Sequence, residues 1–345
     1  MVRNSFLVAA ALLFMGFPML AFGQKFAYEV DFNHFLDNRE YTSNYEMSQT
    51  MLGARLNAMA GASLDTTQGF MGGVNYLYEY GDRINGNTPT VDLFYYYQTP
   101  KFSFIVGSFP RRGLLHYPLA LLTDTLDNYR PNIQGAYLEK RWKWGYENFW
   151  IDWTSRQRPN VRETFLAGLS GELRYNLLFL DHYFYMYHDA LYGDYVPGET
   201  IRDNGAYGML LGINLAPLTH WNTLSFRVGS LGSYNRERPF VGAAGAIDFH
   251  FGFFSQLHAY YRKFGIDASY YKGQSLNAVY GDHMYLSGNY GRIDFAYLPI
   301  NNRFITTRVA VCLHDVDKKW QNSEMLTLIF HVGQSFKSYH NWPTP

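Results

Sequence analysis

The stretch YGRIDFAYLP, residues 290–299, decides the fold. On a helix its two charges would be spread around most of the circumference, whereas in a β-strand successive side chains point to opposite faces. As a strand, it places Ile293, Phe295 and Tyr297 on one face and Arg292 and Asp294 on the other. The stretch therefore predicts a strand between an apolar and an aqueous environment.

The same alternation recurs along the chain, while helical periodicity is nearly absent. Runs bounded by turn residues predict about sixteen strands, with a range of about 14 to 18, spaced roughly every twenty residues. The clearest examples are FAYEVDF (26–32), GVNYLYEY (73–80), WNTLSFRVG (221–229), AIDFHFGF (246–253), FITTRVAVCLH (304–314) and LTLIFHV (326–332).

Composition narrows the class of protein. The 29 Lys and Arg balance the 29 Asp and Glu, so the net charge of zero gives no reason to expect a nucleic-acid partner. The single Cys312 excludes an intrachain disulfide framework. Arg3, the apolar run 6–22 and the small residues that end it predict a secretory signal peptide over residues 1–23. No later stretch is apolar enough for a spanning helix, which needs about 20 residues.

The connections between the expected strands alternate in length. Short ones are expected near 65–68, 99–101, 141–144, 175–176, 217–220, 262–264 and 299–302, and longer polar ones near 37–47, 81–88, 110–130, 155–162, 189–202, 233–239, 273–283 and 315–322. A soluble sandwich would also alternate, but its outward face is usually rich in Lys and Glu. Here aromatic residues, 19% of the chain, load the apolar face. We therefore expect residues 24–345 to form a transmembrane antiparallel β-barrel.

In its architecture the chain resembles the porin-type outer-membrane barrels of Gram-negative bacteria. Its Tyr-rich strands, with GAIDF (245–249) and GRIDF (291–295), are similar to barrels of the Bacteroidota. The resemblance implies location in the cell outer membrane, periplasmic N- and C-termini, contact with membrane lipid and lipopolysaccharide, and a homotrimer. It also implies that the third long connection folds into the lumen as a constriction, although the acidic signature of that loop is missing here.

Charged residues on the polar strand face are the candidate pore lining. Their mixed signs argue against strong selection of anions or cations, and an ion-pair lattice that stiffens the wall is the alternative. They are Glu29, Asp31, Arg55, Glu79, Asp92, Asp152, Arg227, Asp248, Asp267, Arg292, Asp294 and Arg308.

The connection FPRRGLLHYPLALLTDTLDNYRPN has an apolar middle, which is unusual for a loop in water. We expect it to pack against the inner wall and narrow the channel; an external cap is the alternative. Its candidate constriction residues are Arg111, Arg112, His116, Asp124, Asp127 and Arg130.

No motif predicts catalysis, a cofactor or a metal site. His182 and His188 share a strand face but lie about 20 Å apart, too far for one metal. GLSGE around Ser170 lacks the second glycine of a nucleophile elbow. Phe94 and Tyr96 point inward, where they would stack on sugars or, more often, fill space.

These observations favour an outer-membrane channel for passive or weakly selective diffusion of small hydrophilic solutes, and not an enzyme. A non-transporting barrel that serves as a surface adhesin or an assembly or secretion component is the alternative. A barrel enzyme would require Ser, His and Asp clustered at the rim.

Overall fold

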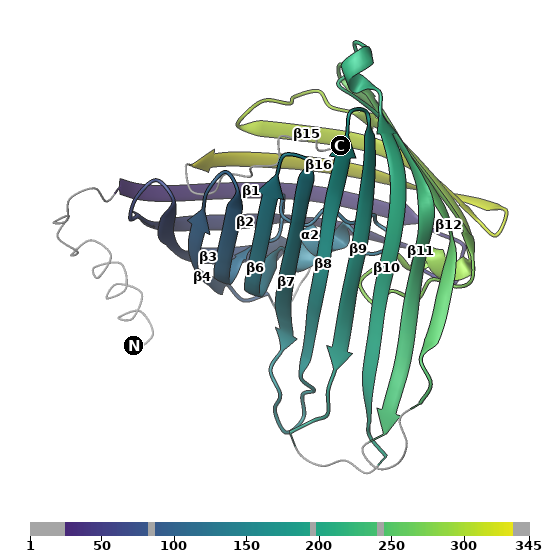
Figure 1. Cartoon of the computed structure of the whole chain (residues 1–345), viewed down its shortest axis with the longest axis horizontal. Coiled ribbons are helices and arrows are strands. Elements are labelled where there is room, and N and C mark those ends of the chain that lie inside the picture. The colour runs from purple at the N-terminus through teal and green to yellow at the C-terminus, as the bar shows by residue number, and fades with distance from the viewer. Residues whose placement is uncertain (1–24, 82–86, 194–197, 240–244, 334–345) are drawn as a thin grey trace.

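The computed structural model describes residues 25–81, 87–193, 198–239 and 245–333. Sixteen antiparallel strands pair in chain order, and β1 pairs with β16 to close the barrel (Figure 1). The predicted fold class is therefore confirmed. The expected signal peptide over residues 1–23 lies outside the described residues.

The strands are 9 to 17 residues long. They are β1 (Lys25–Glu40), β2 (Gln49–Ser63), β3 (Gln68–Glu79), β4 (Thr90–Gln98), β5 (Phe102–Pro110), β6 (Asn132–Trp142), β7 (Gly145–Ser155), β8 (Thr164–Tyr175), β9 (Leu178–Asp189), β10 (Thr200–Asn214), β11 (Thr223–Pro239), β12 (Asp248–Tyr261), β13 (Phe264–Gly273), β14 (Asn289–Tyr297), β15 (Ile305–Val316) and β16 (Lys319–Gly333). Three short helices complete the described chain: α2 (Thr125–Tyr129), η1 (Ala216–Leu218) and η2 (His283–Ser287).

The alternation that predicts β14 is seen directly in its burial. Arg292 and Asp294 are 9% and 4% exposed inside the barrel, whereas Phe295 and Tyr297 are 49% and 40% exposed on the outside. Large apolar side chains cover the outer face of other strands too, among them Leu93 and Phe251. An apolar outer surface on a closed sheet is the arrangement that suits a bilayer, because closure leaves no unpaired strand edge. The protein has the architecture of a transmembrane β-barrel.

Among the described residues, no helix combines the length and the hydropathy that crossing a membrane would need.

The expected long connection at 315–322 is wrong. β15 and β16 continue through this region, and Asp317 and Lys318 alone form the turn, with φ of 51° and 66°. Two successive residues with positive φ are typical of the tightest hairpin turn, whose twist matches that of the strands. The strands here extend beyond the band of apolar side chains on the outer face of the barrel, and the region is therefore polar. A polar stretch was thus part of two strands and not a loop. β11 likewise runs through 233–239, which was expected to be a connection.

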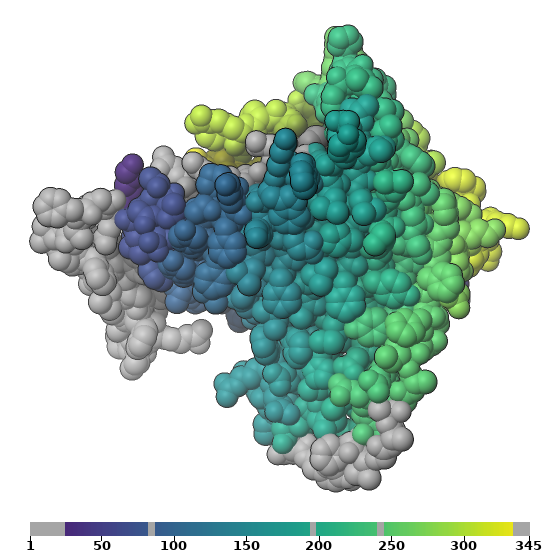
Figure 2. Space-filling view, viewed as in Figure 1, coloured from purple at the N-terminus to yellow at the C-terminus, as the bar shows by residue number. Residues whose placement is uncertain are grey.

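The wall is uneven in height. β4 and β5 have nine residues each, whereas β10 has 15 and β11 has 17. In Figures 1 and 2 the outer wall over β7 to β10 is continuous, and these strands reach further at one end than β2 to β6. The connection that follows the short β5 leaves the wall early and turns into the lumen.

Placing an arginine on the outer face should separate membrane-facing from water-facing positions. Leu93 is the fourth of nine residues in β4 and is 65% exposed to the surroundings of the barrel. We expect Leu93→Arg to lower the free energy of unfolding from phospholipid vesicles by about 2–4 kcal/mol, because a charge near the bilayer centre is poorly solvated. Leu218→Arg, in the exposed η1, is the control, with an expected change of about 1 kcal/mol or less. Equal effects in guanidinium titrations would contradict this placement of the membrane.

Candidate functional site

The third long connection, residues 111–131, packs inside the barrel. Tyr117 donates a hydrogen bond to the carbonyl of Leu169 at 3.0 Å and accepts one from Trp150 Nε1 at 3.1 Å. Tyr185 donates to the carbonyl of Leu121 at 3.0 Å. The buried apolar side chains of the third connection are Leu114, Ala120, Leu121, Leu122 and Leu126. The apolar middle of the connection is thus covered by the inner wall, and α2 lies within the ring of strands (Figure 1).

A second connection, residues 274–288 with η2, also turns inward. The two inward connections bond to each other through their backbones, with Thr123 N to Tyr280 O at 2.8 Å and Asp282 N to Leu119 O at 2.9 Å. Asn204 of β10 holds it to the wall by donating to the carbonyl of Asn277 at 2.7 Å. The sequence analysis took this segment for a polar loop, although its apolar Leu276, Ala278, Met284 and Tyr285 were a signal of burial.

Inward aromatic side chains of β4 pack in the apolar cluster that holds the inward connections. Phe94 and Tyr96 are 2% and 7% exposed and belong to one apolar cluster with residues of both inward connections. Rings packed this closely present no free face for a sugar. The space-filling interpretation of these two residues therefore fits the structure.

A polar cavity of about 190 Å³ lies between the wall and the third connection. Strands β1, β2, β3 and β16 supply one side of it, and the two ends of the third connection supply the other. It is lined by Glu29, Asp31, Asn33, Arg55, Asn57, Asn75, Pro110, Arg112, Asp127, Pro131, Asn132 and His331. The cavity brings together three of the predicted pore-lining residues and two of the predicted constriction residues.

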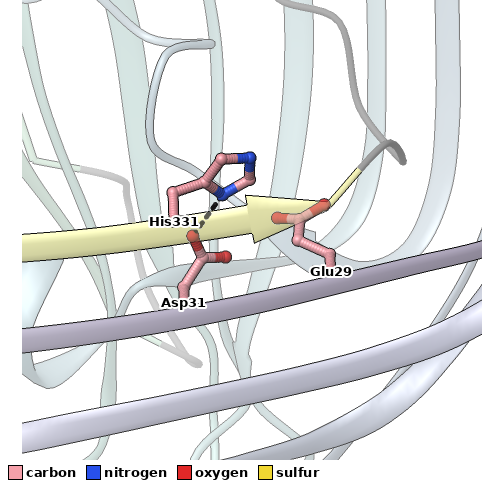
Figure 3. A group of neighbouring side chains, drawn as sticks. All are labelled: Glu29, Asp31 and His331. Carbon is pink, nitrogen blue, oxygen red and sulfur yellow. Dashed lines mark hydrogen bonds and ion pairs between the residues drawn. The ribbon is translucent and has the colours of Figure 1, made fainter. Parts of the chain in front are cut away.

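Asp31 and His331 form the chemically distinctive pair of this cavity. The two residues lie opposite each other where β1 meets β16, and His331 Nδ1 is 2.6 Å from Asp31 Oδ1 (Figure 3). Their side chains are 25% and 44% exposed, whereas Glu29 is only 6% exposed. Glu29, Asp31 and His331 each offer one ligand atom, and these atoms lie within 4.8 Å of one another. The group can orient an imidazole, accept a proton or hold a cation.

Helix α2 is fastened beside the cavity. Arg55 donates from Nε and Nη2 to the carbonyl of Asn128 at 2.8 and 2.6 Å, and Asn33 donates to Asn128 Oδ1 at 3.1 Å. Arg112 Nε lies 3.9 Å from an oxygen of Asp127. Because Arg55 and Asn33 both hold α2, the wall and the third connection form one site.

A different group of predicted pore-lining residues forms an ion network on β13, β14 and β15, beyond the β1–β16 pair that closes the barrel. Arg292 lies 2.7 Å from Asp294, and Arg308 bridges Asp294 at 3.2 Å and Asp267 at 3.4 Å. Arg292 also lies 3.9 Å from Asp124 of the third connection. These contacts match the ion-pair lattice that was the alternative to a selective pore lining.

The remaining predicted residues are dispersed. Asp152 pairs with Arg111 at 2.6 Å and with Arg130 at 3.9 Å, and Arg227 pairs with Asp181 at 2.8 Å. Asp92 accepts from Ser108 and Asn132, and Glu79 accepts from Asn87. His116 is half-buried in the third connection, and Asp248 is exposed at the start of β12 beside His250. None of these predicted pore-lining or constriction residues lines the cavity.

A Ser–His contact occurs away from the cavity. His314 Nε2 is 3.1 Å from Ser323 Oγ, and His314 Nδ1 is 2.7 Å from the Tyr290 hydroxyl. All three side chains are at most 2% exposed. A nucleophile enclosed in this way cannot meet a substrate, so we interpret the contact as structural.

The sequence analysis missed His331 and the cavity asparagines. The alternation in LTLIFHV places residue 331 on the inward face, which was an available signal. The pairing of Asp31 with His331 depends on the register between the first and last strands, 300 residues apart.

Comparison with known proteins gives two kinds of likeness. The family model described as Lipid A 3'-O-deacylase-type matches residues 22–338. No curated protein matches the chain. The expectation that the chain is not an enzyme is therefore not confirmed.

One solved porin shares the fold, and two solved proteins from Pseudomonas aeruginosa have lower TM-scores to this chain. The anion-selective porin from Comamonas acidovorans has a TM-score of 0.51 at 9% identity, covering 90% of this chain and 99% of that chain. The outer membrane protein opdK from Pseudomonas aeruginosa has a TM-score of 0.45 at 10% identity, covering 90% and 99%. OprD from Pseudomonas aeruginosa has a TM-score of 0.45 at 8% identity, covering 92% and 98%. Identities this low show likeness of fold alone.

The contact between the two inward connections should depend on pH through Asp282. Burial raises the pKa of Asp282 from 3.8 to about 6, against the lowering effect of Arg292. A raised pKa in the folded state stabilises the protein below about pH 4, and this contribution is lost as pH rises through about 6. We expect wild type to lose about 3 kcal/mol relative to Asp282→Asn between pH 4 and 7.5, measured by denaturant unfolding in detergent. Asparagine keeps the helix cap that Asp282 provides.

Asp65→Asn is the control, because the pKa of Asp65 is shifted in the opposite direction to that of Asp282. Hydrogen bonds from Thr67 and Gln68 lower the pKa of Asp65 to about 2, so its contribution is lost only as the pH falls below about 4. A difference between wild type and Asp282→Asn that does not change with pH would contradict the assignment.

Proposed function

The chain belongs to the lipid A 3'-O-deacylase-type family, and from this premise we propose that it hydrolyses an ester-linked acyl chain of a lipid A-type glycolipid. The observation that carries the proposal is the Asp31–His331 pair, 2.6 Å apart in a polar cavity and partly exposed. A carboxylate that orients an imidazole is a recurrent way to prepare a base for proton transfer.

Hydrolysis requires a water molecule to be activated beside the ester. The water oxygen bonds to the acyl carbonyl carbon, and its proton passes to a basic group of the set Glu29, Asp31 and His331. The ester C–O bond then breaks, and the departing sugar oxygen takes up a proton. The products are a fatty acid and a glycolipid with a free hydroxyl. Arg112, which lines the cavity and is 40% exposed, is the cation best placed to face negative charge on the substrate.

The two inward connections support an enzyme over an open pore. Two connections bonded to each other cross the interior, and apolar side chains from both are buried against the wall. A channel for hydrophilic solutes needs a continuous wet path, whereas a hydrolase needs one polar cavity. This proposal departs from the channel that the sequence analysis favours.

The test is lipid A profiling by mass spectrometry from cells that express the protein in their outer membrane. We expect wild type to remove one ester-linked acyl chain, and His331→Gln and Asp31→Asn to lower the rate by about 100-fold or more, the usual effect of losing a general base. His258→Gln is the matched control, because His258 lies 2.7 Å from Asp267 inside the same barrel but outside the cavity. Unchanged lipid A with folded wild-type protein, or equal losses in all three variants, would overturn the proposal.

A channel remains the second candidate function. Its supporting observation is the closed sixteen-strand barrel, a size that can enclose a water-filled channel. Diffusion of small hydrophilic solutes would then occur where the inward connections move aside. The homotrimer and the contacts with lipopolysaccharide expected from the porin resemblance stay predictions.

Planar-bilayer conductance separates the two candidates. We expect the intact protein to give little conductance, because the two inward connections narrow the lumen, and deletion of residues 114–127 to give stable open steps. Large, stable conductance of the intact protein would favour the channel over the hydrolase.

A further inference from the structure

We propose that a groove on the outer face of the barrel, over β11 to β16, binds a phospholipid whose head group carries a primary ammonium. In this proposal Asp315 is the counter-ion of the ammonium, and an acyl chain lies along the apolar part of the groove. The groove faces away from the lumen, whereas the Asp31–His331 pair lies inside the barrel. The inference therefore goes beyond the proposed hydrolase and does not rest on it.

Four residues that lie side by side mark one end of the groove. Tyr270 of β13 pairs with Gly291 of β14, and Gly291 pairs with Asp315 of β15. Asp315 pairs in turn with Trp320 of β16. At least one chain neighbour of each residue is buried inside the barrel, so the alternation of side chains turns this row outward. Tyr270 and Trp320 are 40% and 64% exposed, and such outward Tyr and Trp side chains are typical of the membrane–water interface.

The groove extends from this row toward the middle of the strands. It continues over Leu257, Ala268 and Ile293, and its volume of about 340 Å³ lies within the range of small-ligand sites, about 300–1,000 Å³. The space at the row is open because residue 291 is a glycine. A Cβ atom at this position would lie 3.8 Å from Asp315 Cβ and 3.8 Å from Tyr270 Cδ2, with no closer contact. The groove is thus apolar along its length and acidic at one end, which matches an acyl chain with a cationic head group.

The carboxylate of Asp315 lacks a partner. Its Oδ1 atom is buried and receives no hydrogen bond from the residues that the structure describes. A charge on the membrane-facing side of a barrel is costly unless another charge compensates it. A buried acceptor also requires a donor. The partner of Asp315 is therefore a group that is positively charged and donates a hydrogen bond.

Glu324 is an outward carboxylate whose partners are supplied by the protein. It follows Ser323, which is 2% exposed inside the barrel, so Glu324 faces outward. Asn38 donates to Glu324 Oε2 and Asn322 donates to Oε1, both at 2.8 Å. Because both oxygens already accept hydrogen bonds, no ligand is expected there, and Glu324→Gln is the matched control for Asp315→Asn.

A primary ammonium suits this row better than the other charged groups of a membrane. A quaternary ammonium such as choline has no N–H group to donate to Asp315 Oδ1, and a head group with only a phosphate would bring two negative charges together. A metal ion would find Asp315 as the single carboxylate among the described residues that line the groove. Tyr270 and Trp320 lie on either side of Asp315 in the row, and aromatic faces attract ammonium groups. These contacts favour an ethanolamine head group.

The experiment is native mass spectrometry of the full-length barrel, purified in detergent and incubated with one phospholipid at a time. Phosphatidylethanolamine, phosphatidylcholine and phosphatidylglycerol are compared with identical acyl chains. We expect wild type to bind phosphatidylethanolamine about 10-fold more tightly than the other two, which is the scale of one hydrogen bond to a charged group. Asp315→Asn should abolish this preference, and Glu324→Gln should keep it.

A second variant tests the groove independently of its charge. Gly291→Leu places a side chain in the open space between Asp315 and Tyr270, so it should lower the binding of phosphatidylethanolamine while the carboxylate stays in place. The migration of unheated samples in gel electrophoresis confirms that each variant has formed the barrel.

Three outcomes would overturn the inference: equal binding of the three lipids by wild type, an unchanged preference in Asp315→Asn, or a second copy of the chain that occupies the groove in place of lipid. Lipid A profiling reports on the lumen alone. Wild-type protein that leaves lipid A intact would remove the proposed function and leave the outer groove standing.

Discussion

The structure depends on one constraint: every backbone N–H and C=O group inside a bilayer must find a partner within the protein. Sixteen strands meet it by pairing β1 with β16, so the sheet has no edge in the membrane. Closure at this strand number creates an interior too wide for wall side chains alone to fill. Two of the chain's own connections occupy part of this interior and pack against the inner wall.

Inward packing changes the energetics of the wall charges. In a water-filled lumen an ion pair contributes little to the stability of the protein, because water screens each partner. Behind the inward connections, Arg292 and Asp294 are 9% and 4% exposed, and a lone buried charge would be costly. The network that joins Arg292 to Asp124 and to Asp294 therefore stabilises the connection as well as the wall.

The fold could be predicted from the sequence because alternation is a local property. The apolar and polar faces of YGRIDFAYLP can be assigned without knowledge of any other strand. The apolar middle of the third connection likewise indicates that this connection is buried. The site could not be predicted in the same way. Asp31 and His331 meet only through the register of the closing strands, and a shift of one residue would turn one of them toward lipid. The hairpin at Asp317 was missed because strands beyond the bilayer lose their apolar face.

The inward connections also divide the lumen by the balance of donors and acceptors. Around Arg292 each carboxylate has a guanidinium within ion-pair distance, so the negative charges in this part of the lumen are paired. Around Glu29 the guanidinium of Arg55 is directed to Asn128 instead, and acceptor oxygens remain. Chemistry is expected where charge is left unbalanced, because only there does a ligand improve on what the protein already provides. The two polar regions of the lumen thus differ in where their arginine side chains are directed: Arg292 and Arg308 to carboxylates, and Arg55 to the carbonyl of Asn128.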